Sequence, residues 1–312
     1  MGAHVVDVHS HVYPQSYLES MRAARHDVPV PESFSDLAAK LAFMDEHGID
    51  RALVSLGNPW LDPLGAAGEE VAARLNSELA GLAAQTDGRL LGFGVLPQAS
   101  VDSAVATAES VAAEPGLFGL ITGSRICGRR LDDDRLDPLW DLLAAHGLPL
   151  FVHPHHGPGG TGAGAPGSVR ALALGFPLET TLALGDLVLA GIPQRFPGLR
   201  VVGAHCGGAL PVLAGRLQAF WEARAQGEAQ LPGPPSESAA RLAFDAVGYA
   251  PAAVRAALDL AGPARVFFGT DHPFPVAMSD ANRAALEAAL SKDERTDVYG
   301  RAAVEFFGLP PG

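Results

Sequence analysis

The stretch VVDVHSHVYP, residues 5–14, is an apolar run that ends in two histidines, His9 and His11. Along a β-strand, neighbouring side chains point to opposite faces, so residues i and i+2 lie on the same face. His9 and His11 are therefore placed to bind one ion together. The question is which other side chains join them.

Short apolar segments of strand length recur along the whole chain, separated by longer amphipathic stretches. Residues 34–48 place Leu37, Leu41 and Met44 on one helical stripe, and residues 136–147 end at Gly147, as a helix with a glycine C-cap does. Eight strand–helix units in one domain, residues 1–312, predict a (β/α)8 TIM-type barrel, with a doubly wound α/β sheet as the alternative. The predicted strands are 3–8, 51–56, 90–96, 117–122, 149–153, 200–205, 242–247 and 265–270.

Composition excludes several classes of protein. A net charge of −13 and no stripe of basic residues argue against a nucleic-acid partner. No uncharged apolar run reaches the roughly 18 residues of a membrane span, and the N-terminus has no signal-peptide pattern, so we expect no membrane partner and a cytoplasmic location. With only Cys127 and Cys206, we expect two reduced thiols rather than a disulfide framework.

The ends of the predicted strands carry metal-binding residue types. The first ends in His9 and His11, and three later strands end in His153, His205 and Asp271. Active sites of TIM barrels lie where strands end, so these five side chains should meet. Imidazoles with a carboxylate suit one divalent transition ion, Zn²⁺ first and Mn²⁺ as the alternative.

A two-metal site bridged by a carbamylated lysine is the alternative arrangement. The chain has only Lys40, inside a predicted helix, and Lys292, near the C-terminus, and neither ends a strand. We therefore predict a single metal ion.

Several motifs in order resemble those of the amidohydrolase-related decarboxylases, which include aminocarboxymuconate semialdehyde decarboxylase. They are VVDVHSH, FVHPHH, LGFPLETT, RFPGLRVVGAHCGGALPVLAGR and FGTDHPFP. Within this group, MDEHGIDRALVSLGNPW, HPHHG and LALGFPLETT are most similar to isoorotate (5-carboxyuracil) decarboxylase. The resemblance runs from about residue 4 to residue 308 and supports the barrel of the amidohydrolase superfamily.

The resemblance implies a metal-dependent, non-oxidative decarboxylation of a small aromatic or unsaturated carboxylate. It makes His9, His11, His153 and Asp271 the metal ligands and places His205 beside the metal as an acid/base or orienting residue. For the proton that replaces CO₂ we favour Asp271 as the donor, because the isoorotate-like motifs are the stronger ones and burial or the substrate could raise its pKa; a route like that of the aminocarboxymuconate enzyme would put His205 first.

The resemblance also assigns substrate contacts. Asn58 and Phe274 match substrate-binding positions, and Arg216 matches an arginine that reaches the neighbouring active site of a homodimer. From the residues alone, His155 could line the pocket, because it follows His153 closely.

The sequence departs from its relatives after residue 21. Their longer segment, which includes a substrate-binding arginine, is replaced here by RAARHDVPVPES. We expect Arg22, Arg25 and His26 to be solvated on an exposed loop, and the alternative is that one of them replaces that arginine. Cys206 stands where the family has glycine or serine, and we interpret it as a packing residue.

Fold and ligands do not decide the chemistry alone, so other functions stay open. The same metal could activate water, making the protein a hydrolase of a lactone or amide, or a hydratase. A non-catalytic binding protein is the third class.

Overall fold

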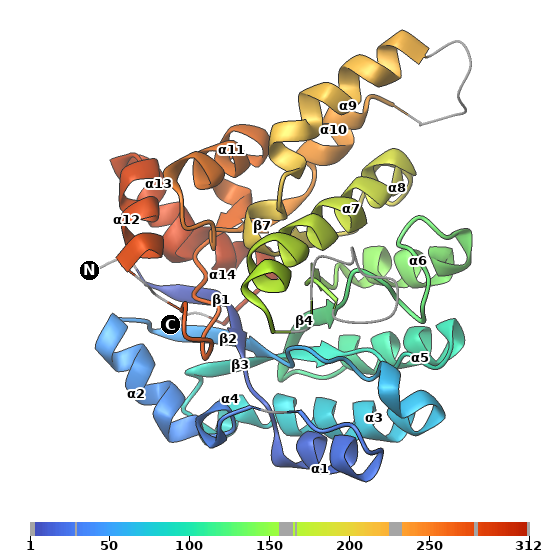
Figure 1. Ribbon diagram of the computed structural model, residues 1–312, viewed down its shortest axis with the longest axis vertical. Coiled ribbons are helices and arrows are strands. Elements are labelled where there is room, and N and C mark those ends of the chain that lie inside the picture. Colours follow the sequence, from blue (N-terminus) through green and yellow to red (C-terminus); the bar gives the residue numbers. More distant parts are fainter. Residues whose placement is uncertain are drawn as a thin grey trace.

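Eight parallel strands form one sheet in which every strand pairs with the next along the chain (Figure 1). The structure is a computed structural model that describes residues 4–28, 30–155, 165, 167–224, 233–277 and 280–310. Every predicted strand is present. The strands are β1 (Val6–His11), β2 (Arg51–Ser55), β3 (Leu90–Val95), β4 (Leu117–Thr122), β5 (Leu150–Val152), β6 (Val201–Gly203), β7 (Ala243–Asp245) and β8 (Val266–Phe267).

The sheet closes on itself between its last strand and its first. Backbone N–H groups of β1 donate to the β8 segment, from Val8 to Phe268 at 3.0 Å and from His11 to His272 at 2.7 Å. In the other direction, Asp271 N–H donates to the carbonyl of His9 at 2.7 Å. This closure and the sequential strand order give the predicted TIM-type barrel and rule out the doubly wound sheet.

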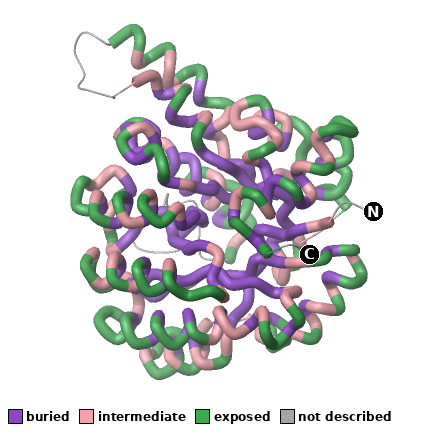
Figure 2. Tube along the Cα trace, turned by 180° about the vertical axis from the view of Figure 1, so that it is seen from behind, coloured by how far each residue is buried: buried purple, intermediate pink, exposed green. Residues whose placement is uncertain are grey.

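Helices surround the strands, which are buried, while the outer helix faces are exposed (Figure 2). Asp36 caps the helix predicted over residues 34–48, and Gly48 ends it in the left-handed conformation. Gly147, with φ of 57°, ends the second predicted helix. The helices are α1 (Gln15–Ala23), α2 (Leu37–His47), α3 (Gly68–Ala80), α4 (Leu82–Gln85), α5 (Val101–Ala112), α6 (Asp137–His146), α7 (Phe176–Leu189), α8 (Ile192–Arg195), α9 (Leu210–Arg224), α10 (Pro235–Ala240), α11 (Pro251–Ala261), α12 (Asp280–Ala289), α13 (Lys292–Thr296) and α14 (Ala302–Phe307).

The strands are buried on both faces, which is typical of parallel sheets covered by helices. All six residues of β1 and all six of β3 are buried. Polar side chains on β1 are therefore enclosed by protein, and each must find a partner there. Both cysteines are free, and Cys206 is buried.

Residues Ala171–Leu189, which include α7, have the length and mean hydropathy of a membrane span. Within α7, however, Ala183, Leu184 and Leu187 are buried against the barrel, and the helix also contains Glu179 and Asp186. The buried face of α7 thus belongs to the core of the barrel.

Asn76 of α3 provides a test of how the helical layer is held to the strands. Its buried amide pairs with the backbone of Val95 in β3, accepting from N–H at 2.7 Å and donating to C=O at 3.1 Å. We expect Asn76→Ala to lower the free energy of unfolding in urea by about 2 kcal/mol, because both backbone groups lose their partner in a buried place. Ser77→Ala, an exposed position on the same helix, is the control, and an equal loss in both variants would contradict the assignment.

Candidate metal centre

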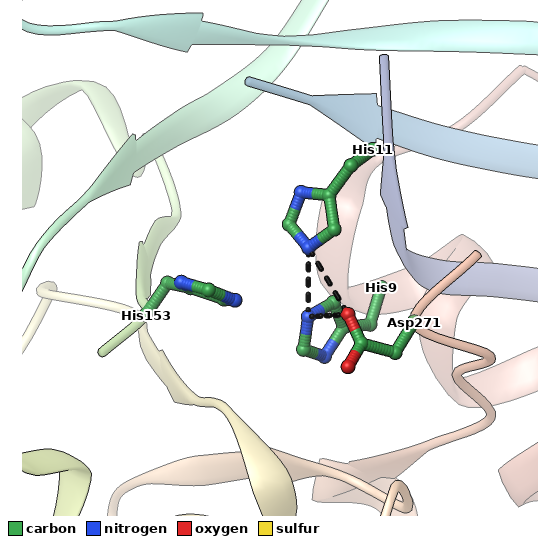
Figure 3. Close-up of side chains that lie close together, drawn as sticks. All are labelled: His9, His11, His153 and Asp271. Atoms are coloured by element: carbon green, nitrogen blue, oxygen red, sulfur yellow. Dashed lines mark hydrogen bonds and ion pairs between the residues drawn. The ribbon is translucent and has the colours of Figure 1, made fainter. Parts of the chain in front are cut away.

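Four side chains from three strand ends meet inside the barrel (Figure 3). His9 and His11 lie on β1, His153 follows β5, and Asp271 follows β8. All four are buried, and their ligand atoms lie within 4.8 Å of one another. The predicted metal-binding group is therefore assembled by the fold.

The spacing of the donor atoms is that of ligands around one ion. His9 Nε2 lies 3.1 Å from His11 Nε2, and these two nitrogens lie 3.4 and 3.3 Å from Asp271 Oδ1. Tetrahedral bonds of about 2.1 Å to one ion separate the donors by roughly 3.4 Å. His153 faces the other three side chains across the site (Figure 3).

A protein acceptor engages Nδ1 of each ligand histidine. His9 Nδ1 lies 2.5 Å from Asp245 Oδ2, and His11 Nδ1 lies 3.1 Å from Ser55 Oγ. His153 Nδ1 lies 3.1 Å from the carbonyl of Pro154. With the proton held on Nδ1, each ring presents Nε2 to the centre, which is how histidines are oriented as metal ligands.

The charges in the site favour a cation at its centre. Burial would lower the pKa of His9, but the carboxylates of Asp271 and Asp245 outweigh it and raise that pKa to about 9. Burial and the neighbouring imidazoles instead hold the pKa of His153 well below its usual range. A metal ion would replace the proton that His9 otherwise carries.

The carboxyl of Asp271 behaves as an anionic ligand. Burial alone would raise its pKa, but the neighbouring imidazoles, with His9 foremost, keep it well below the usual range. Within the described part of the chain, Oδ1 is buried and has no hydrogen-bond donor. Three imidazole nitrogens and this oxygen fit a divalent metal ion.

His205 lies beside the ligand group without belonging to it. It begins the short 3-10 turn after β6, and its Nε2 lies 3.6 Å from Asp271 Oδ2. His205 and Asp271 both have positive φ, 55° and 62°, which is uncommon for residues other than glycine and clusters at functional sites. The two candidate catalytic side chains therefore face each other.

Of the predicted substrate-binding residues, Phe274 contacts a ligand histidine, and Asn58 contacts the residue that follows His153. Asn58 Nδ2 donates to the carbonyl of Pro154 at 2.9 Å, and the Phe274 ring packs edge-on against His11 at 5.6 Å. His155 is buried, and its Nε2 lies 3.6 Å from Asp62 Oδ2. Arg216 lies elsewhere, on α9, where its guanidinium stacks over Phe220.

The residues expected to be solvated are at the surface, and the residue expected to pack in the core is buried. Arg22, Arg25 and His26 are exposed. Cys206 is buried, and its backbone N–H donates to Asp245 Oδ1 at 3.0 Å. Burial raises the pKa of its thiol, which is consistent with a packing residue rather than a reactive one.

Several residues of the site were not singled out from the sequence. Asp245 ends β7 and, besides orienting His9, accepts from the backbone N–H of His205 at 2.9 Å. Its position at a strand end was the signal that could have identified it. Trp60 and Phe176 bring rings within 5.7 and 6.1 Å of His153. Trp60 was expected in the core or at the rim, and Phe176 lies in the LGFPLETT motif, but neither was predicted to line the site.

The role of Asp245 can be measured through metal affinity. We expect Asp245→Ala to weaken Zn²⁺ binding by about 10- to 100-fold, because His9 loses the acceptor that orients its ring. Competition with a chromophoric chelator gives the dissociation constant. Asp259→Ala, on the exposed side of α11, is the control, and unchanged affinity in Asp245→Ala would refute the orienting role.

Comparison with known proteins agrees with this geometry. The amidohydrolase family model matches residues 6–309. The chain is 30% identical to 2-amino-3-carboxymuconate-6-semialdehyde decarboxylase of Dictyostelium discoideum, over 81% of this chain and 70% of that protein. The crystal structure of isoorotate decarboxylase (IDCase) from Metarhizium anisopliae is 31% identical, with a TM-score of 0.86 over 99% of this chain and 98% of that one.

The 5-carboxyvanillate decarboxylase of Sphingomonas paucimobilis is 25% identical, with a TM-score of 0.86 over 99% of this chain and all of that one (100%). A matching family model over nearly the whole sequence and a ligand group at the strand ends lead to one conclusion. The chain belongs to the amidohydrolase family.

Proposed function

We propose that this protein is a metal-dependent carboxy-lyase that removes CO₂, without oxidation, from a small aromatic or unsaturated carboxylate. The observation that carries the proposal is the buried group of His9, His11, His153 and Asp271 beside His205. The similarity of the chain to several decarboxylases favours this activity over hydrolysis or hydration by the same site.

We assign the metal as zinc, with manganese as the alternative. Three imidazoles and one carboxylate suit both ions, and zinc is the more usual partner of a histidine-rich set. When bound, the ion would hold the substrate carboxylate with an adjacent oxygen and take up negative charge.

The surrounding side chains suit a flat substrate. The rings of Trp60 and Phe176 pack near His153, and Phe274 packs against His11. Flat apolar rings bind aromatic and conjugated molecules and exclude water from the reacting carbon. This environment favours protonation by a fixed side chain over protonation by solvent.

We assign the proton transfer to His205. The Asp271 carboxyl is held in its ionised form and its Oδ1 faces the ligand histidines, so it is suited to binding the ion. His205 lies next to it, and within the described residues its Nδ1 has no hydrogen-bond partner. An imidazole so placed can hold a proton and deliver it to the carbon that loses CO₂.

We further propose that the active form is a homodimer. Leu174, in the π-helical turn before α7, and Leu178 and Leu182, in α7, recur every four residues and are all exposed. Helix α9, which carries exposed Val212 and Phe220, projects away from the barrel nearby (Figure 1). An exposed apolar surface of this kind is typical of protein interfaces, and it would bring Arg216 toward the site of a second copy.

The reaction class is tested by CO₂ release from 5-carboxyuracil, hydroxybenzoates and carboxymuconate-type acids. We expect release from at least one acid by the metal-loaded protein. We expect no release from His153→Ala, which should also lose the metal. His205→Ala should keep the metal and lose about 10²- to 10⁴-fold in rate, as expected for a proton donor.

Metal content measured by mass spectrometry separates the possible failures. Metal-loaded protein that releases no CO₂ from any of these acids but hydrolyses lactones would support the hydrolase instead. Full activity without metal would contradict the mechanism.

The cross-subunit role of Arg216 is tested by subunit mixing. We expect Arg216→Ala to raise KM for the carboxylate by about 10-fold or more, because the charge-assisted contact is lost. Co-expressing it with His153→Ala should recover about a quarter of wild-type activity, since half of the dimers then hold one complete site. The single variants are the controls, and no recovery in proven heterodimers, or a fully active monomer, would refute this role.

A further inference from the structure

Lys40 is a buried cation outside the ligand group. It lies on α2 with 3% of its surface exposed, whereas Lys292, the only other lysine, is exposed. A buried ammonium group is costly unless hydrogen-bond acceptors surround it, and an apolar side chain would fill the same space without that cost. The residues around Lys40 should therefore explain why a lysine is present.

The ammonium group contacts the two segments that carry three of the four ligands. Lys40 Nζ donates to Ser10 Oγ at 2.6 Å, and Ser10 lies between His9 and His11 on β1. Nζ also lies 2.9 Å from His272 Nδ1, and His272 directly follows Asp271. One cation thus joins the two sides of the seam where the barrel closes.

The His272 ring is held by contacts from two sides. Its ring stacks on Phe43 of α2 at 3.9 Å between ring centroids, with 26° between the planes. The ring is therefore fixed on one face by α2 and at Nδ1 by Lys40.

A second buried charged side chain, Asp7, lies at the same seam. Its carboxylate accepts from Thr270 Oγ1 at 2.6 Å, Thr270 N at 3.1 Å and His9 N at 3.0 Å. Asp7, through Thr270, and Lys40, through Ser10 and His272, thus both connect β1 to the segment after β8.

Lys40 does not act as a metal ligand itself. His9 and His11 point into the barrel, so Ser10 between them points to the opposite face of β1. Lys40 contacts that outer face, and among the described residues the metal-binding group contains no lysine. A carbamylated Lys40 bridging two ions is excluded by this position.

We infer that Lys40 is a positioning residue for the metal centre: its ammonium group fixes Ser10 and His272, and through them the separation of His9 and His11 from Asp271. This inference rests on the metal site of the proposed function. It does not depend on the identity of the substrate.

The test is metal affinity measured against stability. Lys40→Met keeps an unbranched side chain that is one atom shorter and removes the charge and the hydrogen bonds. We expect Mn²⁺ to bind at least about 10-fold more weakly, as is typical for residues that orient metal ligands, and the electron paramagnetic resonance spectrum of bound Mn²⁺ to change. Lys292→Met, at an exposed position, is the control and should match the wild type in both measurements.

Ser10→Ala provides a second variant that keeps Lys40 in place. It should also weaken Mn²⁺ binding, and its effect should not add to that of Lys40→Met, because the two residues share one contact. If Lys40→Met does not fold, the affinity and spectrum of Ser10→Ala decide the question.

The outcomes separate this inference from the proposed function. Wild-type affinity and an unchanged spectrum in folded Lys40→Met, or in Ser10→Ala where Lys40→Met does not fold, would overturn the positioning role. Weakened binding would support it, whether or not any acid in the panel is decarboxylated. A wild-type protein that binds no metal would overturn both, whereas metal binding without CO₂ release would count only against the decarboxylase.

Discussion

The metal centre depends on the closure of the barrel between β8 and β1. His9 and His11 stand on one side of that seam and Asp271 on the other, and the hydrogen bond from Asp271 N–H to the carbonyl of His9 brings them together. A small shift of either strand end would separate Asp271 Oδ1 from both imidazoles, because ligand spacing around one ion tolerates only a few tenths of an ångström. Around the seam, Lys40 pairs with Ser10 and His272, and Asp7 pairs with Thr270.

These partners come from different elements, and each fixes a different property of the site. Asp245 on β7 sets the orientation and charge of His9, while Ser55 on β2 sets the orientation of His11. Enclosing so many ionisable groups carries a desolvation cost, which is offset only when opposite charges and hydrogen bonds are in place. Asp271 and Asp245 both lie next to His9, and a divalent cation would balance their negative charge.

The residues that surround the metal ligands, rather than the ligands themselves, distinguish one activity of this fold from another. Aromatic rings near His153 and His11 suit a planar acid, and His205 beside Asp271 is suited to proton transfer. The basic residues of the segment after β1 are exposed. In the proposed function, Arg216 of a second copy of the chain binds the substrate carboxylate, and the exposed leucines of α7 are part of the surface that would bring it there.

The sequence by itself determined the barrel and the ligand group. In a barrel of parallel strands the residues at the strand ends must converge, so strand periodicity was enough to bring His9, His11, His153, His205 and Asp271 together, and the family resemblance separated the four ligands from His205. Only the tertiary structure decided which groups orient them. Asp245 lies 236 residues from His9, and Lys40 lies 232 residues from His272, so no local pattern records either contact. The low pKa of Asp271 likewise reflects charges that only folding gathers, and periodicity carries no information about them.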